Sequence, residues 1–148
     1  MKHKNAEMIK AVVDNVELVV MAEVIEPEDD SRNYWAVSNL GVLAVASNSF
    51  FLCLPQHKEA CLHWLNGGES QLEYTHQSYP TWNSIDSDAK GWSIGNVFMD
   101  SSLKIRIKPK KEKRWIRYSS KGVLKDEYIN KPECINRGDQ LIEIEVEV

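Results

Sequence analysis

Histidines and a cysteine lie close together in one part of this chain, at a spacing that could hold a metal ion. His57, Cys61 and His63 fall within a helix predicted over residues 57–66, and His76 follows it. His57 and Cys61 are four residues apart, so a helix places them on one face, and imidazole and thiolate both bind Zn²⁺. The chain has no Cys-x-x-Cys or His-x-x-x-His pair, so the plainer interpretation keeps Cys61 in the helix core. We therefore predict no metal site and no cofactor.

A second group of polar side chains could in principle support nucleophilic catalysis. His76, Ser78, Asp86 and Asp88 fall in one loop predicted over residues 76–91, and a catalytic triad needs only a hydroxyl, an imidazole and a carboxylate that meet in space. The loop lacks the Gly-x-Ser-x-Gly turn that presents a nucleophile, and the chain's Gly-Gly pair lacks the Lys-Ser or Lys-Thr of a phosphate loop. We therefore expect no catalytic residues and a protein that is not an enzyme.

Basic residues are concentrated between residues 104 and 121. This stretch holds nine bases and one acid, a net charge of +8, so the remainder of the chain carries −12 within a total of −4. Lysine and arginine side chains bind the phosphates of a nucleic acid. Trp115 lies among them in the sequence, where an indole ring can stack on an unpaired nucleobase. One alternative function is therefore a single-stranded nucleic-acid-binding protein that uses the segment 104–121.

The C-terminal segment offers the basic stretch a partner inside the protein. Residues 141–148 alternate apolar side chains with Glu143, Glu145 and Glu147, which is typical of a strand with one acidic face. Opposite charges that face each other across neighbouring strands stabilise the pair. Either a ligand or this acidic strand is therefore expected to neutralise the basic residues.

Aromatic residues give the loop over residues 76–91 its strongest functional signal. Tyr79 and Trp82 lie in it, and loop aromatics are common anchors in protein interfaces because they offer a large contact area with few rotatable bonds. The remaining tryptophans before residue 110 are expected in the core: Trp35, Trp64 and Trp92. The predicted contact residues are Tyr79, Trp82, Asp86 and Asp88 in the loop, and Lys110, Lys111, Lys113, Arg114 and Arg117 in a basic hairpin.

Hydrophobic periodicity and turn residues predict the elements that position these side chains. Helices are predicted over 4–14 and 57–66, and strands over 16–25, 34–37, 41–46, 50–54, 70–75, 92–99, 103–108, 113–118, 123–128 and 141–148. The strands at 113–118 and 123–128 form a hairpin with a turn at 119–122. The composition, 43% hydrophobic and 27% charged, is that of a globular protein, and no apolar run reaches the roughly 18 residues of a membrane span.

The chain contains an internal repeat. His3-Lys4-Asn5-Ala6 recurs as His57-Lys58-Glu59-Ala60, and the ending of residues 51–55 recurs at 105–109, both at an offset of 54 residues. We predict an α+β fold of two tandem helix-plus-antiparallel-sheet units, with a C-terminal β-hairpin and edge strand. The predicted units are residues 1–56 and 57–110, with an extension over 111–148 packed on them. Edge strands in such units can self-associate, so a homo-oligomer is one alternative.

The two ends of this repeat resemble those of a known group of proteins. The opening His3-Lys4-Asn5-Ala6-Glu7-Met8-Ile9-Lys10-Ala11 is similar to the His-Lys-x-Ala-Glu-x-Ile-Lys-Ala start of small phage and prophage proteins of unassigned function. Leu103-Lys104-Ile105-Arg106-Ile107-Lys108-Pro109 resembles their Tyr-Arg-Ile-Lys-Pro closing strand. Asn15 replaces the usual glycine of the first turn, and the first closing strand, Phe51-Leu52-Cys53-Leu54, has no bases. The resemblance covers residues 3–109 and implies a phage origin.

These observations lead to one expected function and one further alternative. The resemblance implies a phage origin. With no catalytic residues predicted, we expect a non-enzymatic protein of the host cytoplasm, where three unpaired cysteines stay reduced, that binds a host protein and inhibits it in counter-defence by covering a surface. The order of helix, turn and tryptophan-bearing sheet is also similar to phage anti-Thoeris proteins, which sequester nucleotide signals. The alternative is therefore a sponge that binds a nucleotide immune signal with Arg, Lys and Trp. No membrane partner is expected.

Overall fold

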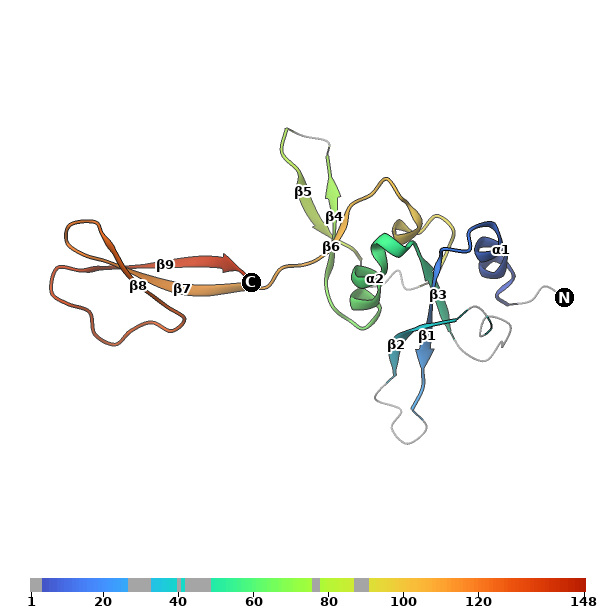
Figure 1. Ribbon diagram of the computed structural model, residues 1–148, viewed down its shortest axis with the longest axis horizontal. Helices are drawn as coiled ribbons and strands as arrows, with labels where there is room; N and C mark the ends of the chain where they lie inside the picture. Colours follow the sequence, from blue (N-terminus) through green and yellow to red (C-terminus); the bar gives the residue numbers. More distant parts are fainter. Residues whose placement is uncertain (1–3, 27–32, 40, 42–48, 76–77, 87–90) are drawn as a thin grey trace. The chain divides into compact units, whose positions relative to one another are not determined.

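The computed structural model describes residues 4–26, 33–39, 41, 49–75, 78–86 and 91–148. These residues contain two α-helices and nine strands in three antiparallel sheets, which confirms the α+β class (Figure 1). Contacts between residues divide the chain into two compact units, residues 1–108 and 109–148, which we call unit 1 and unit 2.

The first half of unit 1 consists of helix α1 (Ala6–Asp14) and strands β1 (Val19–Val24), β2 (Tyr34–Ser38) and β3 (Phe50–Cys53), paired in the order β2-β1-β3. Helix α1 buries Ala11 and Val12, whereas Val13 and Val16, which helical spacing predicts on its apolar face with Ala6 and Ile9, are exposed. It ends at Asn15, whose N–H donates to the Ala11 carbonyl at 2.9 Å. Asn15 has an extended backbone with φ of −142°, so the helix ends without a residue in the left-handed cap conformation that asparagine can adopt.

The second half of unit 1 repeats this order of elements. A short 3₁₀ helix, η2 (Pro55–His57), leads into helix α2 (Lys58–Leu65), which is followed by β4 (Ser70–Tyr74), β5 (Thr81–Ser84), the 3₁₀ helix η3 (Val97–Met99) and β6 (Ile105–Ile107). The pairing order is β5-β4-β6. Each half is thus a helix followed by three strands, of which the first is central; descent from one duplicated unit stays a prediction.

Two glycines let the chain turn sharply after α2. Gly67 has φ of +90°, a conformation that side chains with a Cβ rarely adopt, and its N–H donates to the Trp64 carbonyl at 3.0 Å. A Cβ on Gly68 would lie 2.1 Å from His63 Nε2, so a side chain at this position requires the His63 ring to move. Asn66 then ties the end of α2 to the edge strand β2, because its side chain accepts from Trp35 N at 2.8 Å and donates to Trp35 O at 3.1 Å.

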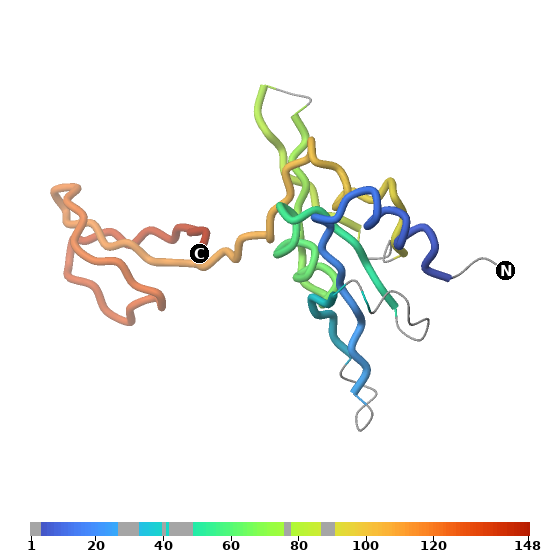
Figure 2. Tube along the Cα trace, turned by 45° about the vertical axis from the view of Figure 1, so that its right-hand side comes forward, coloured from blue at the N-terminus to red at the C-terminus, as the bar shows by residue number. Residues whose placement is uncertain are grey.

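Strand β3 is buried on both faces, which places it at the centre of unit 1. Phe50 and Leu52 pack into a cluster with Val12 of α1, whereas Phe51 and Cys53 pack into a second cluster with α2. Rings from four different elements meet in this second cluster: Trp35, Phe51, Trp64 and Phe98. The sheet β2-β1-β3 therefore has a hydrophobic cluster on each of its faces, and β1 and β3 lie side by side within it (Figure 2).

Two predicted segments differ from the structure. The predicted loop 76–91 contains strand β5, which pairs with β4 from Tyr74↔Thr81 to Gln71↔Ser84. The predicted strand 92–99 is instead a series of turns that ends in η3, where the Asn96 side chain accepts from Phe98 N at 3.0 Å. Of the strand predicted over 41–46, residues 42–46 lie outside the described residues.

Unit 2 is a single three-stranded sheet in the order β8-β7-β9, formed by β7 (Lys111–Tyr118), β8 (Leu124–Tyr128) and β9 (Gln140–Glu147). The predicted C-terminal hairpin and edge strand are confirmed. The hairpin turn contains Gly122 with φ of +74°, whose N–H donates to Ser119 O at 2.8 Å. No residue between 109 and 148 is fully buried, so this unit depends on its hydrogen-bond ladders and on ion pairs rather than on a core.

Candidate partner-binding surface

The sheet β5-β4-β6 places one of the predicted contact residues on the face that α2 does not cover. Residues paired directly across strands share a face, so Glu73 lies with Trp82, and Gln71 with Arg106. We call these four residues the Trp82 face. The opposite face carries Ser70 and Leu72, and the Ser70 hydroxyl donates to the Ala60 carbonyl of α2 at 2.7 Å.

Arg106 holds Trp82 in place on this face. Its guanidinium carbon lies 4.1 Å from the centroid of the Trp82 ring, and its Nε donates to Gln71 Oε1 at 3.0 Å. A cation above an indole ring is attracted by the electrons of the ring face. The neighbouring Glu73 carboxylate pairs with Lys104 Nζ at 3.0 Å. Trp82 is therefore a half-buried aromatic side chain whose orientation is fixed before any partner binds.

Tyr79 lies just before β5, in the segment that joins β4 to β5. Its side chain is 78% exposed, and β4 and β5, which flank it, extend away from helix α2 (Figures 1 and 2). Strand β5 is an edge of its sheet, so backbone groups along its outer side are not used within the sheet. Arg106 was not among the predicted contact residues. Its alternation with Ile105 and Ile107 in the sequence could have identified it, because this pattern places the basic side chains of the strand on one face.

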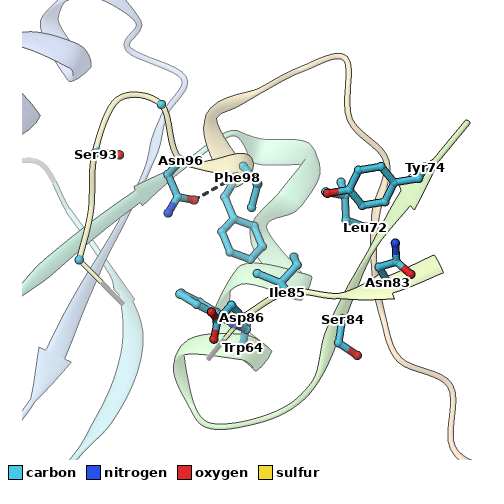
Figure 3. A pocket seen from close by; sticks show the side chains of 13 residues that line it. Trp64, Leu72, Tyr74, Asn83, Ser84, Ile85, Asp86, Ser93, Asn96 and Phe98 are labelled. Carbon is cyan, nitrogen blue, oxygen red and sulfur yellow. Dashed lines mark hydrogen bonds between the residues drawn. The ribbon is translucent and has the colours of Figure 1, made fainter. Parts of the chain in front are cut away.

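Of the two predicted loop carboxylates, the structure describes only Asp86. Asp86 lines a cavity together with Trp64 and Phe98, on the side of α2 (Figure 3). Asp88 lies outside the described residues. The structure places Asp86 at this cavity, and the contact of Tyr79, Trp82 and Asp86 with a partner stays a prediction.

The basic residues of unit 2 are mostly paired with acids of the same sheet. Strand β7 pairs with the acidic strand β9 over its whole length, which is one of the two alternatives that the charge pattern left open. The ion pairs of the predicted contact residues are Lys111–Glu145 at 3.4 Å, Lys113–Glu143 at 2.7 Å, Arg114–Glu127 at 2.7 Å, and Arg117 with Asp126 and Asp139. The hydrogen bond to Glu143 raises the pKa of Lys113, and that to Glu127 raises the pKa of Arg114. Lys110 is exposed at the start of this sheet.

Three of the four candidate metal ligands lie in the described part of the chain. His57 is buried, and its Nε2 lies 2.9 Å from the Asp100 carbonyl oxygen. Cys61 faces the core, and His63 lies against Gly68. His76 is outside the described residues, and among the described residues no three His, Cys, Asp or Glu side chains form a group that could hold a metal ion.

The three thiols are expected to differ in reactivity. Cys53 and Cys61 are buried, whereas Cys134 is exposed. A hydrogen bond with Cys53, together with burial, raises the pKa of Cys61, so little of this thiol is the reactive thiolate at neutral pH. Titration of the folded protein with a thiol reagent at pH 7 should modify only Cys134, and in denaturant all three cysteines should react. Rapid modification of the Cys134→Ser variant in its folded state would contradict the buried placement of the other two.

Within the described part of the chain, no helix is both long and apolar enough to cross a membrane. Comparison of the chain with protein-family models, with curated proteins and with solved structures found no match.

Proposed function

We propose that the protein acts without catalysis, by binding another protein through the Trp82 face and the adjoining Tyr79, and that it inhibits this partner by covering its surface. The observation that carries the proposal is Trp82, fixed over Arg106 on a face of the sheet that α2 leaves open. An aromatic side chain that is already ordered loses little conformational entropy on binding, so more of its contact energy contributes to affinity.

The kind of partner follows from the surface and from the phage-like motifs. The edge of β5 offers backbone groups to a strand of another protein, and Tyr79 and Trp82 beside it offer apolar anchors. The opening and closing motifs resemble those of small phage proteins, so the expected partner is a host protein of the cytoplasm and the expected role is counter-defence.

The alternatives receive less support from the geometry. A nucleic-acid-binding role for residues 104–121 needs lysine and arginine side chains that are not already paired with acids. Six of these side chains form ion pairs with carboxylates of the protein: Lys104, Lys108, Lys111, Lys113, Arg114 and Arg117. A protein that sequesters a nucleotide needs basic side chains around a cavity to bind the phosphate. The described residues that line the cavity beside Trp64 include no Lys, Arg or His.

The proposal is tested by capture from a lysate of the bacterial host, followed by affinity measurement with the purified partner. Trp82→Ala is expected to weaken the affinity about tenfold, because central aromatic anchors typically contribute more than about 1 kcal/mol. Tyr34→Ala is the matched control, since it removes an exposed aromatic side chain from β2, the corresponding edge strand of the other sheet. The absence of a stoichiometric partner, or equal affinity for both variants, would refute the proposal.

A further inference from the structure

The apolar side chains of unit 2 gather on one face of its sheet. Residues paired directly across strands share a face, so Ile116 of β7 lies with Ile142 of β9, and Tyr118 lies with Leu124 of β8. We call this side the apolar face of unit 2, and its apolar members are Ile116, Tyr118, Leu124, Ile142, Ile144 and Val146. The other face carries ion pairs that link neighbouring strands, among them Lys113–Glu143 and Arg117–Asp126. The sheet is therefore amphipathic.

The apolar face remains accessible in a single chain. Leu124 is 58% exposed and Ile142 is 43% exposed. Within residues 109–148, all of which the structure describes, no residue is fully buried and no helix or second sheet covers this face. A sheet with one apolar face is normally packed against a second layer, and a small sheet gains much of its stability from that packing. The apolar face of unit 2 therefore has the properties of one half of a two-layer core.

The edges of this sheet disfavour pairing of two copies edge to edge. If two β9 strands paired with their apolar side chains on a common face, acids would lie opposite acids, because Glu143, Glu145 and Glu147 occupy every second position. The other edge, β8, is only five residues long and lies beside a bulge at Arg117/Tyr118, and short edges next to bulges pair poorly. A second copy is therefore expected to contact the face of the sheet and not its edges.

The charges at one end of the apolar face fit a second copy of the same face. Glu112 and Arg114 follow each other on this side of the central strand β7, with Arg114 Nη2 at 3.7 Å from Glu112 Oε2. A two-fold axis perpendicular to the strands makes the two β7 strands antiparallel, and an axis that passes between these two residues brings each Glu112 to the Arg114 of the other copy. Arg114 also pairs with Glu127 at 2.7 Å, and a guanidinium group has enough donors for both carboxylates. The face is therefore complementary to itself in charge as well as in its apolar character.

We propose that two copies of the chain associate through the apolar faces of unit 2 and form a two-layer sandwich with Ile116, Ile142 and Ile144 near its centre. Three strands of up to eight residues give each copy a contact of at most about 26 Å by 14 Å. This is at the small end of specific interfaces, so the dissociation constant is expected in the micromolar range. The inference goes beyond the proposed function, because it uses none of the residues of the Trp82 face. A dimer carries two Trp82 faces and can bind a multivalent partner with higher avidity.

The first experiment is sedimentation equilibrium of the whole protein from low micromolar to millimolar concentration. The average mass should rise from that of one chain to that of two and then stay constant, because a two-fold contact between identical faces is closed. The mass of one chain at every concentration would overturn the proposal, and so would a mass that continues to rise beyond two chains. Trp82→Ala should dimerise like the unchanged protein, so loss of partner binding and loss of dimerisation are separate results. Dissociation of the Trp82→Ala variant would place the contact outside unit 2 and refute the proposal.

Two isoleucines of similar exposure give a matched pair of variants. Ile142 on the apolar face is 43% exposed, and Ile135 in the connection between β8 and β9 is 38% exposed. Ile142→Lys should weaken dimerisation about hundredfold, because the two-fold axis brings two uncompensated charges into one interface. Ile135→Lys should leave dimerisation unchanged. Because Ile142 is accessible in a single chain, its variant should keep the far-ultraviolet circular dichroism of the unchanged protein.

Two further variants decide the result if Ile142→Lys does not fold. Glu112→Arg changes a side chain that is 48% exposed, and it should weaken dimerisation about tenfold because it places an arginine opposite Arg114 of the other copy. Glu145→Gln changes the opposite face and should leave a face-to-face dimer unchanged, whereas it would tighten a dimer formed by the edges of β9. Unchanged dimerisation of Glu112→Arg together with that of a folded Ile142→Lys variant, or tighter dimerisation of Glu145→Gln, would refute the apolar face as the contact.

Discussion

Replacement of Phe51 by alanine is expected to lower the free energy of unfolding of unit 1 by about 3–5 kcal/mol, the usual cost of removing a buried aromatic ring. Phe51 is completely buried at the point where β3 faces α2, and its ring contacts those of Trp35, Trp64 and Phe98 at centroid distances of 6.5, 5.8 and 6.1 Å. The three neighbours come from β2, α2 and the segment before β6, so their backbones cannot all move inward to fill the space. A loss of this size is a large fraction of the roughly 5–15 kcal/mol that stabilises a typical domain.

The measurement is chemical denaturation followed by near-ultraviolet circular dichroism, which reports the packing of these rings. Tyr79→Ala is the matched control, because it also removes an aromatic ring but from an exposed position, and we expect it to leave stability almost unchanged. A loss below about 1 kcal/mol for Phe51→Ala would mean that the site collapses easily, which would contradict the tight aromatic cluster.

Replacement of Arg117 by alanine is expected to have the largest effect in unit 2, a loss of about 2–3 kcal/mol. The Arg117 side chain is 18% exposed and forms ion pairs with Asp126 and, through Nε at 3.7 Å, with Asp139. Asp139 is only 6% exposed, and Lys125, also at 3.7 Å, is its other basic neighbour among the ion pairs of this unit. Loss of Arg117 therefore leaves a carboxylate in a partly desolvated position with half of its charge compensation removed.

Hydrogen exchange of the β7 and β9 amides, measured in the whole protein, separates this effect from unit 1. Lys113→Ala is the control, since it breaks the ion pair with Glu143 at a side chain that is 66% exposed and surrounded by water. Exposed pairs contribute little, so the exchange rates should scarcely change in this variant. Equal acceleration of exchange in the two variants would show that burial of Asp139 is not what makes Arg117 important.

The two closing strands of the repeat have similar positions in their sheets but different surroundings, which explains a difference in their sequences. Strand β3 meets a hydrophobic cluster on each face, and all four of its residues are buried. A base at Phe51 or Leu52 would lose its hydration there without gaining a partner. Strand β6 has one face turned away from α2, and Arg106 lies on it over Trp82. The missing bases in the first closing strand therefore reflect burial of that strand between the two helices.

Local patterns were sufficient where neighbours along the chain determine the structure. Both helices, the hairpin on either side of residues 119–122 and the C-terminal strand formed close to their predicted positions, because helical spacing, alternation and turn residues act within a few residues. The alternation of acids in residues 143–147 left two partners open for the basic segment, a ligand or the acidic strand, and the structure pairs β9 with β7.

Contacts between distant segments decided what the local patterns could not. Thr81–Ser84 is a strand because β4 supplies its hydrogen bonds, and residues 92–99 are not one because Asn96 caps a 3₁₀ helix and Trp92 donates to Leu52. Trp82 and Asp86 are four residues apart, but Trp82 contacts Arg106 whereas Asp86 lines the cavity beside Trp64 and Phe98. The buried Nε1–H of Trp64 finds no acceptor among the described residues, and this could not be predicted from its sequence position, because whether a buried donor finds an acceptor depends on which distant groups surround it.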